Sequence, residues 1–336
     1  MRLVMMGTGT FAEPTLEALL PGPDPVVGVF TQPDREGAQK RGSTRQVGRG
    51  MKEIAAERGV PVLQPESINT PEGVAMLRDL QPDLLVVAAY GQILSKEVLS
   101  VPTQVAINVH GSLLPKYRGA APVAHAILNG ETETGVTIIR MSIGLDAGDM
   151  LAKAAVPIGD ETAGELEAKL APLGARLAVE TIQRLKAGPV TGEKQDPKLV
   201  TKAPKLTKEM GLIDWTKPAE QVCRQVRAMQ PWPTAYTYLH RQGKPPIRVI
   251  VSRASMGQNV ADPTGRRLGF FAPELGNGPA GSAAMPSPAD LWVRNGAGAG
   301  AQILELQPAG KKRMSAEEFL RGHPLKEGDR FGPESG

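Results

Sequence analysis

Two polar side chains stand two positions apart at the end of an apolar run. The run Val105–Val109 has the composition of a buried strand; it contains Asn108 and leads into His110. In an extended chain, residues two apart point to the same face. An amide and an imidazole on one face can donate hydrogen bonds to an oxygen that gains negative charge. A lone histidine is more often structural, but this pair at a strand end predicts a reactive centre, because burying it without partners would cost free energy.

Asp146 offers a third polar group, in a loop bounded by glycines. The loop Ser142–Asp149 follows the strand-like run Val136–Arg140. If that strand lies beside the one that carries His110, the Asp146 carboxylate can reach the imidazole, orient it and favour its protonated form. Asp149 lies in the same loop, and spacing alone does not separate the two aspartates. A glycine-bounded aspartate can also serve only to close a turn.

Short β-rich runs alternate with helical patterns in the first part of the chain. Most of these runs are continuously apolar, as expected for parallel strands that are covered on both faces. The alternation predicts an α/β fold, a Rossmann-like open parallel sheet with helices on both faces. Ligands of such sheets bind outside the carboxyl ends of the strands, where Asn108 and His110 are expected. The predicted strands are Arg2–Met6, Val26–Thr31, Leu84–Ala88, Val105–Val109 and Val136–Arg140.

Two of the intervening helices have recognisable sequence features. Thr70 can cap the N-terminus of a helix, and Pro71 is favourable at its first position. A second helix is indicated by the apolar stripe Leu166, Leu170, Leu173 and Leu177. We expect Pro172 to interrupt that helix, because proline lacks the N–H that a helix interior needs.

The sequence changes in character after Pro197. One helical stretch, Ala219–Met229, is followed by short β-like runs between Gly/Pro turns. This pattern favours a small β-barrel or sandwich. We therefore expect a catalytic domain over residues 1–197, a linker over 198–209 and a β domain over 210–336. Residues 273–288, rich in glycine, alanine, proline and serine, are expected to form a long loop. The β-like runs are Ala235–Leu239, Arg248–Val251, Leu291–Val293 and Gln302–Leu306.

Composition is that of an ordinary globular protein. The chain is 41% hydrophobic and 22% charged, and no stretch approaches the roughly 20 apolar residues of a membrane helix. Its first residues do not resemble a secretory signal. A single cysteine, Cys223, excludes an intrachain disulfide, and the histidines are too scattered for metal-site spacing. We therefore expect a cytoplasmic protein with neither a membrane segment nor a bound metal.

Positive charge is unevenly distributed along the chain. Residues 1–206 carry 22 Lys and Arg against 23 Asp and Glu, a net charge of −1, whereas residues 207–336 carry 17 against 12, a net charge of +5. A further basic cluster lies between Arg35 and Lys52. Two basic regions suggest a large anionic partner such as nucleic acid. The alternative is a solvated loop and an unremarkable basic domain, and charge alone favours it.

A glycine-containing turn, Gly7–Phe11, follows the first predicted strand. It lacks the third glycine of the dinucleotide-binding fingerprint, and no clear acidic residue ends the second strand to hold a ribose. A tight strand-to-helix turn is therefore the favoured interpretation.

At the residues singled out above, the sequence resembles the folate-dependent formyltransferases. Asn108, His110 and Asp146 match the catalytic asparagine, histidine and aspartate of that family. Along its whole length the chain is similar to the family members that act on methionyl-tRNA. The segments that carry this likeness are Thr31–Arg35, Arg118–Pro122, Lys205–Glu209, Ile213–Trp215, Gln230–Pro233 and Gln307–Met314.

The resemblance implies a reaction, its substrates and its site residues. It implies transfer of the formyl group of 10-formyltetrahydrofolate, a co-substrate, to methionyl initiator tRNA by a monomer without a metal. Asn108, His110 and Asp146 would then be catalytic. The second domain would be a small β-barrel (OB-like) that helps to hold the tRNA. The segment that corresponds to the family's folate-binding stretch is Ser112, Leu113, Leu114 and Pro115.

The basic loop after the second strand departs from the family pattern. In the family this loop inserts at the tRNA acceptor end and commonly closes with Pro-Ser-Pro, whereas this chain reads Thr44–Gly50 there. Its charge is kept, so we expect it to bind tRNA. Two rivals are a formyltransferase for a small amine or nucleotide sugar, and a non-catalytic RNA-binding protein. The expected tRNA-binding residues are Arg35, Lys40, Arg41, Arg45 and Arg49.

Overall fold

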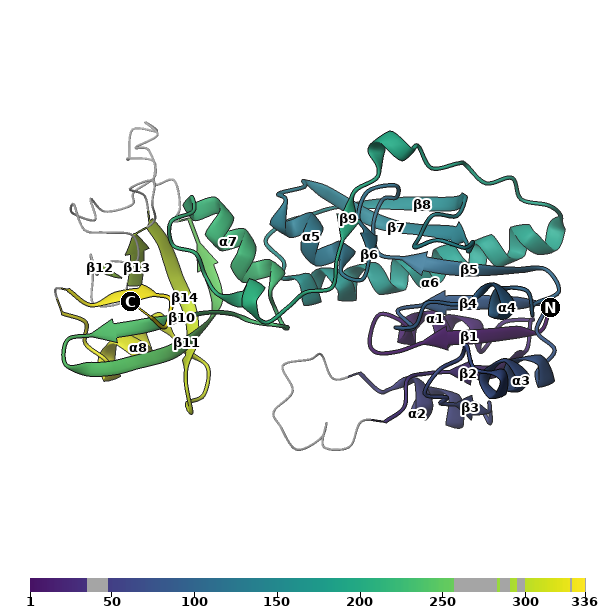
Figure 1. Ribbon diagram of the computed structural model, residues 1–336, viewed down its shortest axis with the longest axis horizontal. Helices are drawn as coiled ribbons and strands as arrows, with labels where there is room; N and C mark the ends of the chain where they lie inside the picture. The colour runs from purple at the N-terminus through teal and green to yellow at the C-terminus, as the bar shows by residue number, and fades with distance from the viewer. Residues whose placement is uncertain (35–47, 257–282, 285–290, 295–299, 327, 336) are drawn as a thin grey trace. The chain divides into compact units, whose positions relative to one another are not determined.

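A computed structural model of the chain describes residues 1–34, 48–256, 283–284, 291–294, 300–326 and 328–335 (Figure 1). The chain forms two compact units. The first unit comprises Met1–Ala126, Glu131–Gly159 and Gly164–Lys205. The second comprises Ile127–Gly130, Asp160–Ala163 and Leu206–Gly336. Most of the predicted long loop at 273–288, and the predicted tRNA contacts Arg35, Lys40, Arg41 and Arg45, lie outside the described residues.

The first unit is built on a mostly parallel sheet. Its strand order is β3-β2-β1-β4-β5-β7-β8, and all neighbours up to β5 pair in parallel. Strands β7 and β8 are antiparallel to their neighbours, so the expectation that Val136–Arg140 lies in a parallel sheet is wrong. After two buried residues, β8 alternates between partly buried and exposed side chains, which is typical of an antiparallel strand with one open face. The strands are β1 (Leu3–Gly7), β2 (Val26–Phe30), β3 (Val62–Leu63), β4 (Leu84–Ala88), β5 (Val105–His110), β7 (Glu133–Arg140) and β8 (Met150–Pro157).

Helices cover both faces of this sheet. Side chains of α3 and α4 pack with Val4 of β1 and Ala106 of β5 in one buried cluster. On the opposite face, α6 approaches closely: a Cβ added at its Gly174 would lie 2.7 Å from Val109 and 3.4 Å from Val136. The predicted α/β class is therefore confirmed. The helices are α1 (Glu13–Leu19), α2 (Met51–Ala56), α3 (Pro71–Asp79), α4 (Lys96–Leu99), α5 (Pro122–Leu128) and α6 (Ala163–Ala187).

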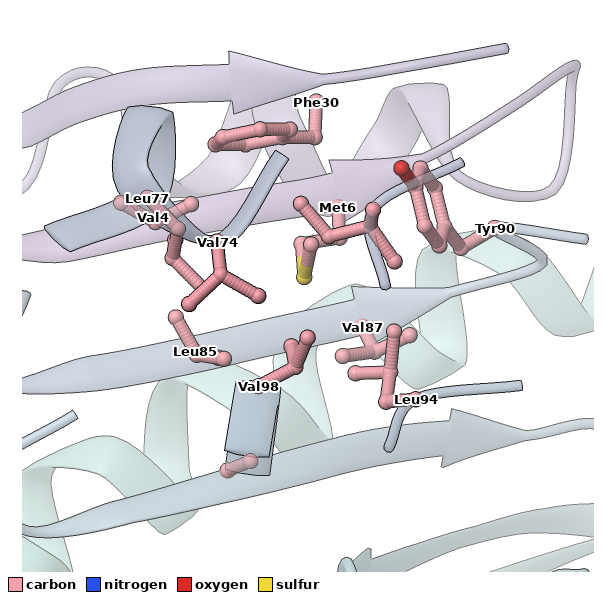
Figure 2. Packing of buried hydrophobic residues seen from close by; sticks show 12 residues of the cluster. Val4, Met6, Phe30, Val74, Leu77, Leu85, Val87, Tyr90, Leu94 and Val98 are labelled. Atoms are coloured by element: carbon pink, nitrogen blue, oxygen red, sulfur yellow. The ribbon is translucent and has the colours of Figure 1, made fainter. Parts of the chain in front are cut away.

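One buried cluster of the first unit lies between β1, β4 and the helices α3 and α4. Figure 2 shows Met6 and Val87 of the strands packed near Val98 of α4. The ring of Tyr90 belongs to the same cluster and lies at the carboxyl ends of the strands. Burial raises the pKa of Tyr90 to about 12, so its hydroxyl stays neutral. This packing fixes the strand ends from which the candidate site is built.

Two helix predictions had different outcomes. The start of α3 is confirmed, because the Thr70 hydroxyl accepts a hydrogen bond of 3.1 Å from the Gly73 N–H and Pro71 is the first helical residue. The predicted interruption at Pro172 is wrong, since α6 runs through it without a break. Pro172 lies on the exposed side of α6, whereas Leu166 and Leu170 on the other side are fully buried. Burial of that apolar side outweighs the missing hydrogen bond.

The second unit is an antiparallel sheet with two α-helices and one short 3-10 helix, Glu209–Gly211, among its described residues. The strand order is β12-β13-β14-β11-β10-β16, and β15 pairs with β14. α8 begins with a capping box, in which Ser315 and Glu318 exchange hydrogen bonds. The predicted small β domain is confirmed, and its sheet is antiparallel. The elements are α7 (Ala219–Ala228), β10 (Ala235–Arg241), β11 (Lys244–Ser255), β12 (Ala283–Ala284), β13 (Leu291–Arg294), β14 (Gly300–Pro308), β15 (Met314–Ser315), α8 (Ala316–Gly322) and β16 (Arg330–Gly332).

The chain between α6 and the second unit is partly ordered against the first unit. It contains a short helix, Pro197–Leu199, and the strand β9 (Lys202–Ala203). β9 pairs in parallel with β6 (Arg118–Gly119). Residues 198–203, expected as part of a linker, therefore contribute a strand to the first unit.

Candidate active site

The site is built at the carboxyl end of β5, where the strand lies between β4 and β7. Asn108 pairs with Val87 of β4 on one side and with Ile139 of β7 on the other. His110 is the last residue of the strand and is only 5% exposed. Ladder hydrogen bonds on both sides fix this stretch of backbone, so the two side chains leave the same face of the sheet in a defined direction.

His110 has an acceptor opposite each ring nitrogen. Its Nε2 lies 2.9 Å from the carbonyl oxygen of Tyr117, and because a carbonyl can only accept, Nε2 carries the hydrogen. Its Nδ1 lies 3.6 Å from Oδ2 of Asp146, which is longer than a hydrogen bond. Because Nε2 already carries a hydrogen, a second proton on Nδ1 would make the ring cationic. The imidazole ring is thus oriented with Nδ1 toward the Asp146 carboxylate.

The Asp146 carboxylate is oriented by the backbone of β6. Oδ2 accepts a hydrogen bond of 2.9 Å from the Gly119 N–H, and Oδ1 lies 3.5 Å from Nδ2 of Asn108. The side chain is 13% exposed. Asp146 also has a φ of +48°, a conformation that costs roughly 1–3 kcal/mol outside glycine and needs surrounding contacts to hold it.

The structure distinguishes Asp146 from Asp149, which sequence spacing alone did not separate. Asp149 is directed toward Gly192, since its Cβ would lie 2.6 Å from a Cβ added there. Asp146, by contrast, has one carboxylate oxygen facing Asn108 and the other facing His110. The structure thus brings together Asn108, His110 and Asp146.

Contacts from distant parts of the chain support this cluster. Tyr117, whose carbonyl faces His110, donates its N–H to the Thr201 hydroxyl over 2.8 Å. Its hydroxyl donates to Glu131 over 2.7 Å, and this hydrogen bond lowers the pKa of the Glu131 carboxyl. Gly119 lies so close to β9 that an added Cβ would be 2.4 Å from the Ala203 carbonyl oxygen. None of these residues was predicted to support the site, and among them only Gly119 lies in a segment that carries the family resemblance, Arg118–Pro122.

The predicted folate-binding segment is largely internal. Ser112 is fully buried and donates its hydroxyl to the Lys116 carbonyl over 2.7 Å. Leu114 is 2% exposed and packs with β7 and β8. Leu113 and Pro115 are half-buried and keep some accessible surface. Ser112 and Leu114 therefore shape the loop, and Leu113 and Pro115 are the side chains a ligand can touch.

Arg49 is the one predicted tRNA-binding residue that the structure describes. Its guanidinium forms ion pairs with Glu57 and, over 3.2 Å, with Glu17. Glu57 raises the pKa of the Arg49 guanidinium. Arg49 is thus already engaged within the first unit. Across the described ranges, no group of three or more His, Cys, Asp or Glu residues is placed to hold a metal ion.

Family models match both parts of the chain. The model described as "Formyl transferase" matches residues 1–182. The model described as "Formyl transferase, C-terminal domain" matches residues 205–324. The first match contains Asn108, His110 and Asp146, and the second covers most of the antiparallel sheet.

Similar proteins extend these matches over almost the full length. The methionyl-tRNA formyltransferase of Magnetococcus marinus is 44% identical over 341 residues, which cover 98% of this chain and 98% of that protein. That of Trichlorobacter lovleyi is 45% identical over 326 residues, 96% of this chain and 95% of that protein. Among solved structures, the sugar 3N-formyl transferase WlaRD, in the presence of dTDP and 5-N-formyl-THF, has a TM-score of 0.64. It is 16% identical and covers 93% of this chain and 99% of that chain, a likeness that shows the fold alone.

Proposed function

The chain belongs to the formyl transferase family, and we infer that it transfers the formyl group of 10-formyltetrahydrofolate to the amino group of methionyl initiator tRNA. The observation that carries this conclusion is identity of 44–45% to methionyl-tRNA formyltransferases over nearly the whole of both chains. That identity spans the second unit as well as the catalytic one. A nucleotide-sugar acceptor has weaker support, because the sugar formyltransferase shares only 16% identity.

The acceptor needs positioning more than activation. The reference pKa of an α-amino group is about 7.7–8.0, so a useful share is already neutral near pH 7. Holding the amine against the formyl carbon can supply ~7–11 kcal/mol of the barrier, more than any single side chain. Residues that fix geometry are therefore central to this reaction.

We assign Asn108 and His110 to the developing oxyanion. When the amine lone pair attacks the formyl carbon, the C–N bond forms and the formyl oxygen gains negative charge. The Asn108 amide can donate to that oxygen. His110 can donate from Nδ1 only, because Nε2 is held by the Tyr117 carbonyl. One preorganised donor of this kind is worth roughly 3–4 kcal/mol.

Asp146 is assigned to proton transfer. The attacking amine must lose a proton, and the bond between the formyl carbon and N10 of the folate must break with its electron pair going to N10. The departing N10 takes up a proton, so one proton moves from the amine nitrogen to N10. Asp146 is the basic group of the cluster, and it lies next to both Asn108 and His110. We propose that it accepts that proton and returns it, which is worth about 10²–10⁴-fold in rate.

Substrate contacts, cellular location and oligomeric state are also part of the proposed function. Leu113 and Pro115 would contact the folate, and the basic loop beginning at Arg35 would contact tRNA phosphates. The second unit, in the part of the chain that carries the +5 net charge, would hold the tRNA body. A translation enzyme of this kind acts in the cytoplasm, and we expect a monomer. No helix in the described part of the chain is long and apolar enough to span a membrane.

The direct test supplies 10-formyltetrahydrofolate and methionyl initiator tRNA and measures N-formylmethionyl-tRNA. The expected result is product at a rate proportional to enzyme. Parallel reactions offer an amino-sugar nucleotide as acceptor and measure tRNA binding without folate. Formylation of the sugar nucleotide alone would support the small-amine rival, and tRNA binding without any product would support a non-catalytic RNA-binding protein.

A further inference from the structure

Gln195 lies in the stretch between α6 and β9, far in sequence from the three site residues. Its half-buried side-chain amide makes four hydrogen bonds. Nε2 donates to the carbonyl oxygens of Asp146 over 2.7 Å and Gly148 over 2.8 Å. Oε1 accepts from Nε and Nη2 of Arg118 over 2.9 and 2.8 Å. Every donor and acceptor site of the amide is used.

The part of the loop that precedes Asp146 is exposed. Ser142, Ile143, Gly144 and Leu145, which precede Asp146, are all exposed, with Ile143 at 73% and Leu145 at 57%. Asp146 itself has a positive φ, which is uncommon outside glycine. A strained residue at the end of an exposed loop keeps its conformation only when other contacts fix it. The two hydrogen bonds from Gln195 fix the backbone on both sides of Ala147.

The Gln195 amide also links the two contacts that hold Asp146, one to its backbone carbonyl and one to its carboxylate. The backbone of Asp146 is held by Gln195, and its carboxylate is held by the N–H of Gly119. Gly119 directly follows Arg118, whose guanidinium is bound by Gln195. Gln195 therefore sets the distance between the Asp146 loop and the β6 backbone.

We propose that Gln195 is a positioning residue that fixes the Asp146 carboxylate toward Asn108 and His110. The role in catalysis rests on the proposed function, in which Asp146 transfers a proton. Gln195 does not touch the reacting atoms; it acts through Asp146. An error of about 1 Å in such a group can cost roughly 100-fold in rate.

Two substitutions separate the contributions of the amide. Gln195→Glu keeps an oxygen for Arg118 but replaces the donors by a carboxylate oxygen, which faces two carbonyl oxygens. Gln195→Leu removes both sets of hydrogen bonds at similar volume. The matched control is Gln225→Glu in the second unit, because Gln225 Nε2 also donates to two carbonyls, those of Met210 and Leu212, over 2.8 Å each.

Hydrogen exchange of three amides in the same segment reports the position of Asp146 directly. The Gly119 N–H is bonded to the Asp146 carboxylate, whereas the N–H groups of Arg118 and Ala121 are bonded to the carbonyls of Thr201 and Ala203. In Gln195→Glu we expect faster exchange at Gly119 and unchanged exchange at Arg118 and Ala121. General loosening of the unit would instead accelerate all three.

Kinetics of formyl transfer provide the second measurement. We expect kcat of Gln195→Glu to fall roughly 10- to 100-fold with KM for the tRNA changed less than threefold. Gln225→Glu should keep the wild-type kcat and Gly119 exchange. Unchanged kcat and unchanged Gly119 exchange in both Gln195 variants would overturn the proposal, as would equal acceleration of all three amides. If the wild type makes no N-formylmethionyl-tRNA, the proposed function fails, while Gly119 exchange still decides whether Gln195 positions Asp146.

Discussion

Two of the three polar side chains of the site, those of His110 and Asp146, are held by backbone groups. The Tyr117 carbonyl fixes the ring of His110, and the Gly119 N–H fixes the carboxylate of Asp146. The contacts among the three side chains themselves are longer, 3.5 Å from Asn108 to Asp146 and 3.6 Å from His110 to Asp146. Asn108, His110 and Asp146 thus lie close together in a fixed arrangement. Their long mutual contacts leave hydrogen-bonding capacity for a substrate. That condition suits groups that must bond to a transition state.

Replacing Asp146 by asparagine tests the proposed role of this single residue in proton transfer. An asparagine oxygen can still accept from the Gly119 N–H, but the side chain can no longer take up a proton. We expect kcat to fall by about 10²–10⁴-fold while KM for the tRNA stays within a few-fold. The matched control is Asp149→Asn in the same loop, which should keep the wild-type rate. Wild-type turnover in Asp146→Asn, measured in the same assay, would remove Asp146 from the mechanism.

At the scale of elements, a pair of very short strands supports the site. β6 and β9 pair in parallel, and their contact brings the segment before the second unit against the backbone that orients Asp146. Gly119 is required at this crossing for two reasons. Its φ is +129°, and an added Cβ would overlap the Ala203 carbonyl oxygen. The pairing of β6 and β9 therefore depends on a residue without a side chain.

Gly119→Ala is expected to damage both stability and turnover. The clash with Ala203 should separate β6 from β9, lower the free energy of unfolding by more than about 1 kcal/mol and reduce kcat. Gly59→Ala is the control, because Gly59 also has a positive φ of +66° but has no atom within 4 Å of an added Cβ. It should lose only the roughly 1–2 kcal/mol that comes from φ strain, and keep full turnover. Thermal unfolding and kcat of the two variants would show whether the crossing matters to the site.

A carboxyl on α6 predicts a pH-dependent stability. Burial raises the pKa of Glu167 to about 7. The native state then holds this proton more tightly than the unfolded state, where the pKa is near 4.5. Stability from this group should be full below about pH 4.5, fall as pH rises, and be lost above about pH 7.

Glu167→Gln should flatten that part of the stability profile. Tm of the wild type is expected to fall more than that of the variant between pH 5 and pH 8. Glu180→Gln on the same helix, where the carboxylate is 60% exposed, should follow the wild type. Parallel profiles for wild type and Glu167→Gln would show that burial of this carboxyl has no thermodynamic effect.

At the scale of the whole molecule, charge distribution matches an anionic substrate. The catalytic part is nearly neutral, with a net charge of −1 over residues 1–206, and the remainder carries +5. Phosphate contacts made by such a chain release counterions, so binding should weaken steeply with salt. Arg49 is already paired with Glu17 and Glu57. The other predicted tRNA-binding residues of the basic loop are Arg35, Lys40, Arg41 and Arg45, and two of these are chosen for the test.

Charge reversal of Arg41 and Arg45 to glutamate should weaken tRNA binding in a salt-dependent manner. Each lost phosphate contact lowers the slope of log K against log salt by roughly 0.7–0.9, so the double variant should lose about 1.4–1.8. Arg78→Glu, which removes an exposed pair with Glu97, is the control and should keep the wild-type slope. A loss of affinity that is the same at all salt concentrations would argue against phosphate contacts by this loop.

Local sequence was sufficient for the α/β class and for most strands of the central sheet. Strands such as β4 were predicted with correct bounds, because continuous apolar runs reflect burial on both faces. The start of α3 was equally local, since Thr70 and Pro71 act within one helical turn. The continuity of α6 through Pro172 was missed, because packing on the sheet overrode the local cost of proline.

For the site, the sequence by itself determined that Asn108 and His110 share one face at the end of a strand, because side chains alternate with a period of two. It left Asp146 and Asp149 equivalent until the family resemblance favoured Asp146. Only the tertiary structure decided what holds Asp146, since Gly119 and Gln195 lie 27 and 49 residues away along the chain. Such contacts depend on how β6, β9 and the loop after β7 pack together. Local sequence patterns do not predict contacts between segments so far apart in the chain.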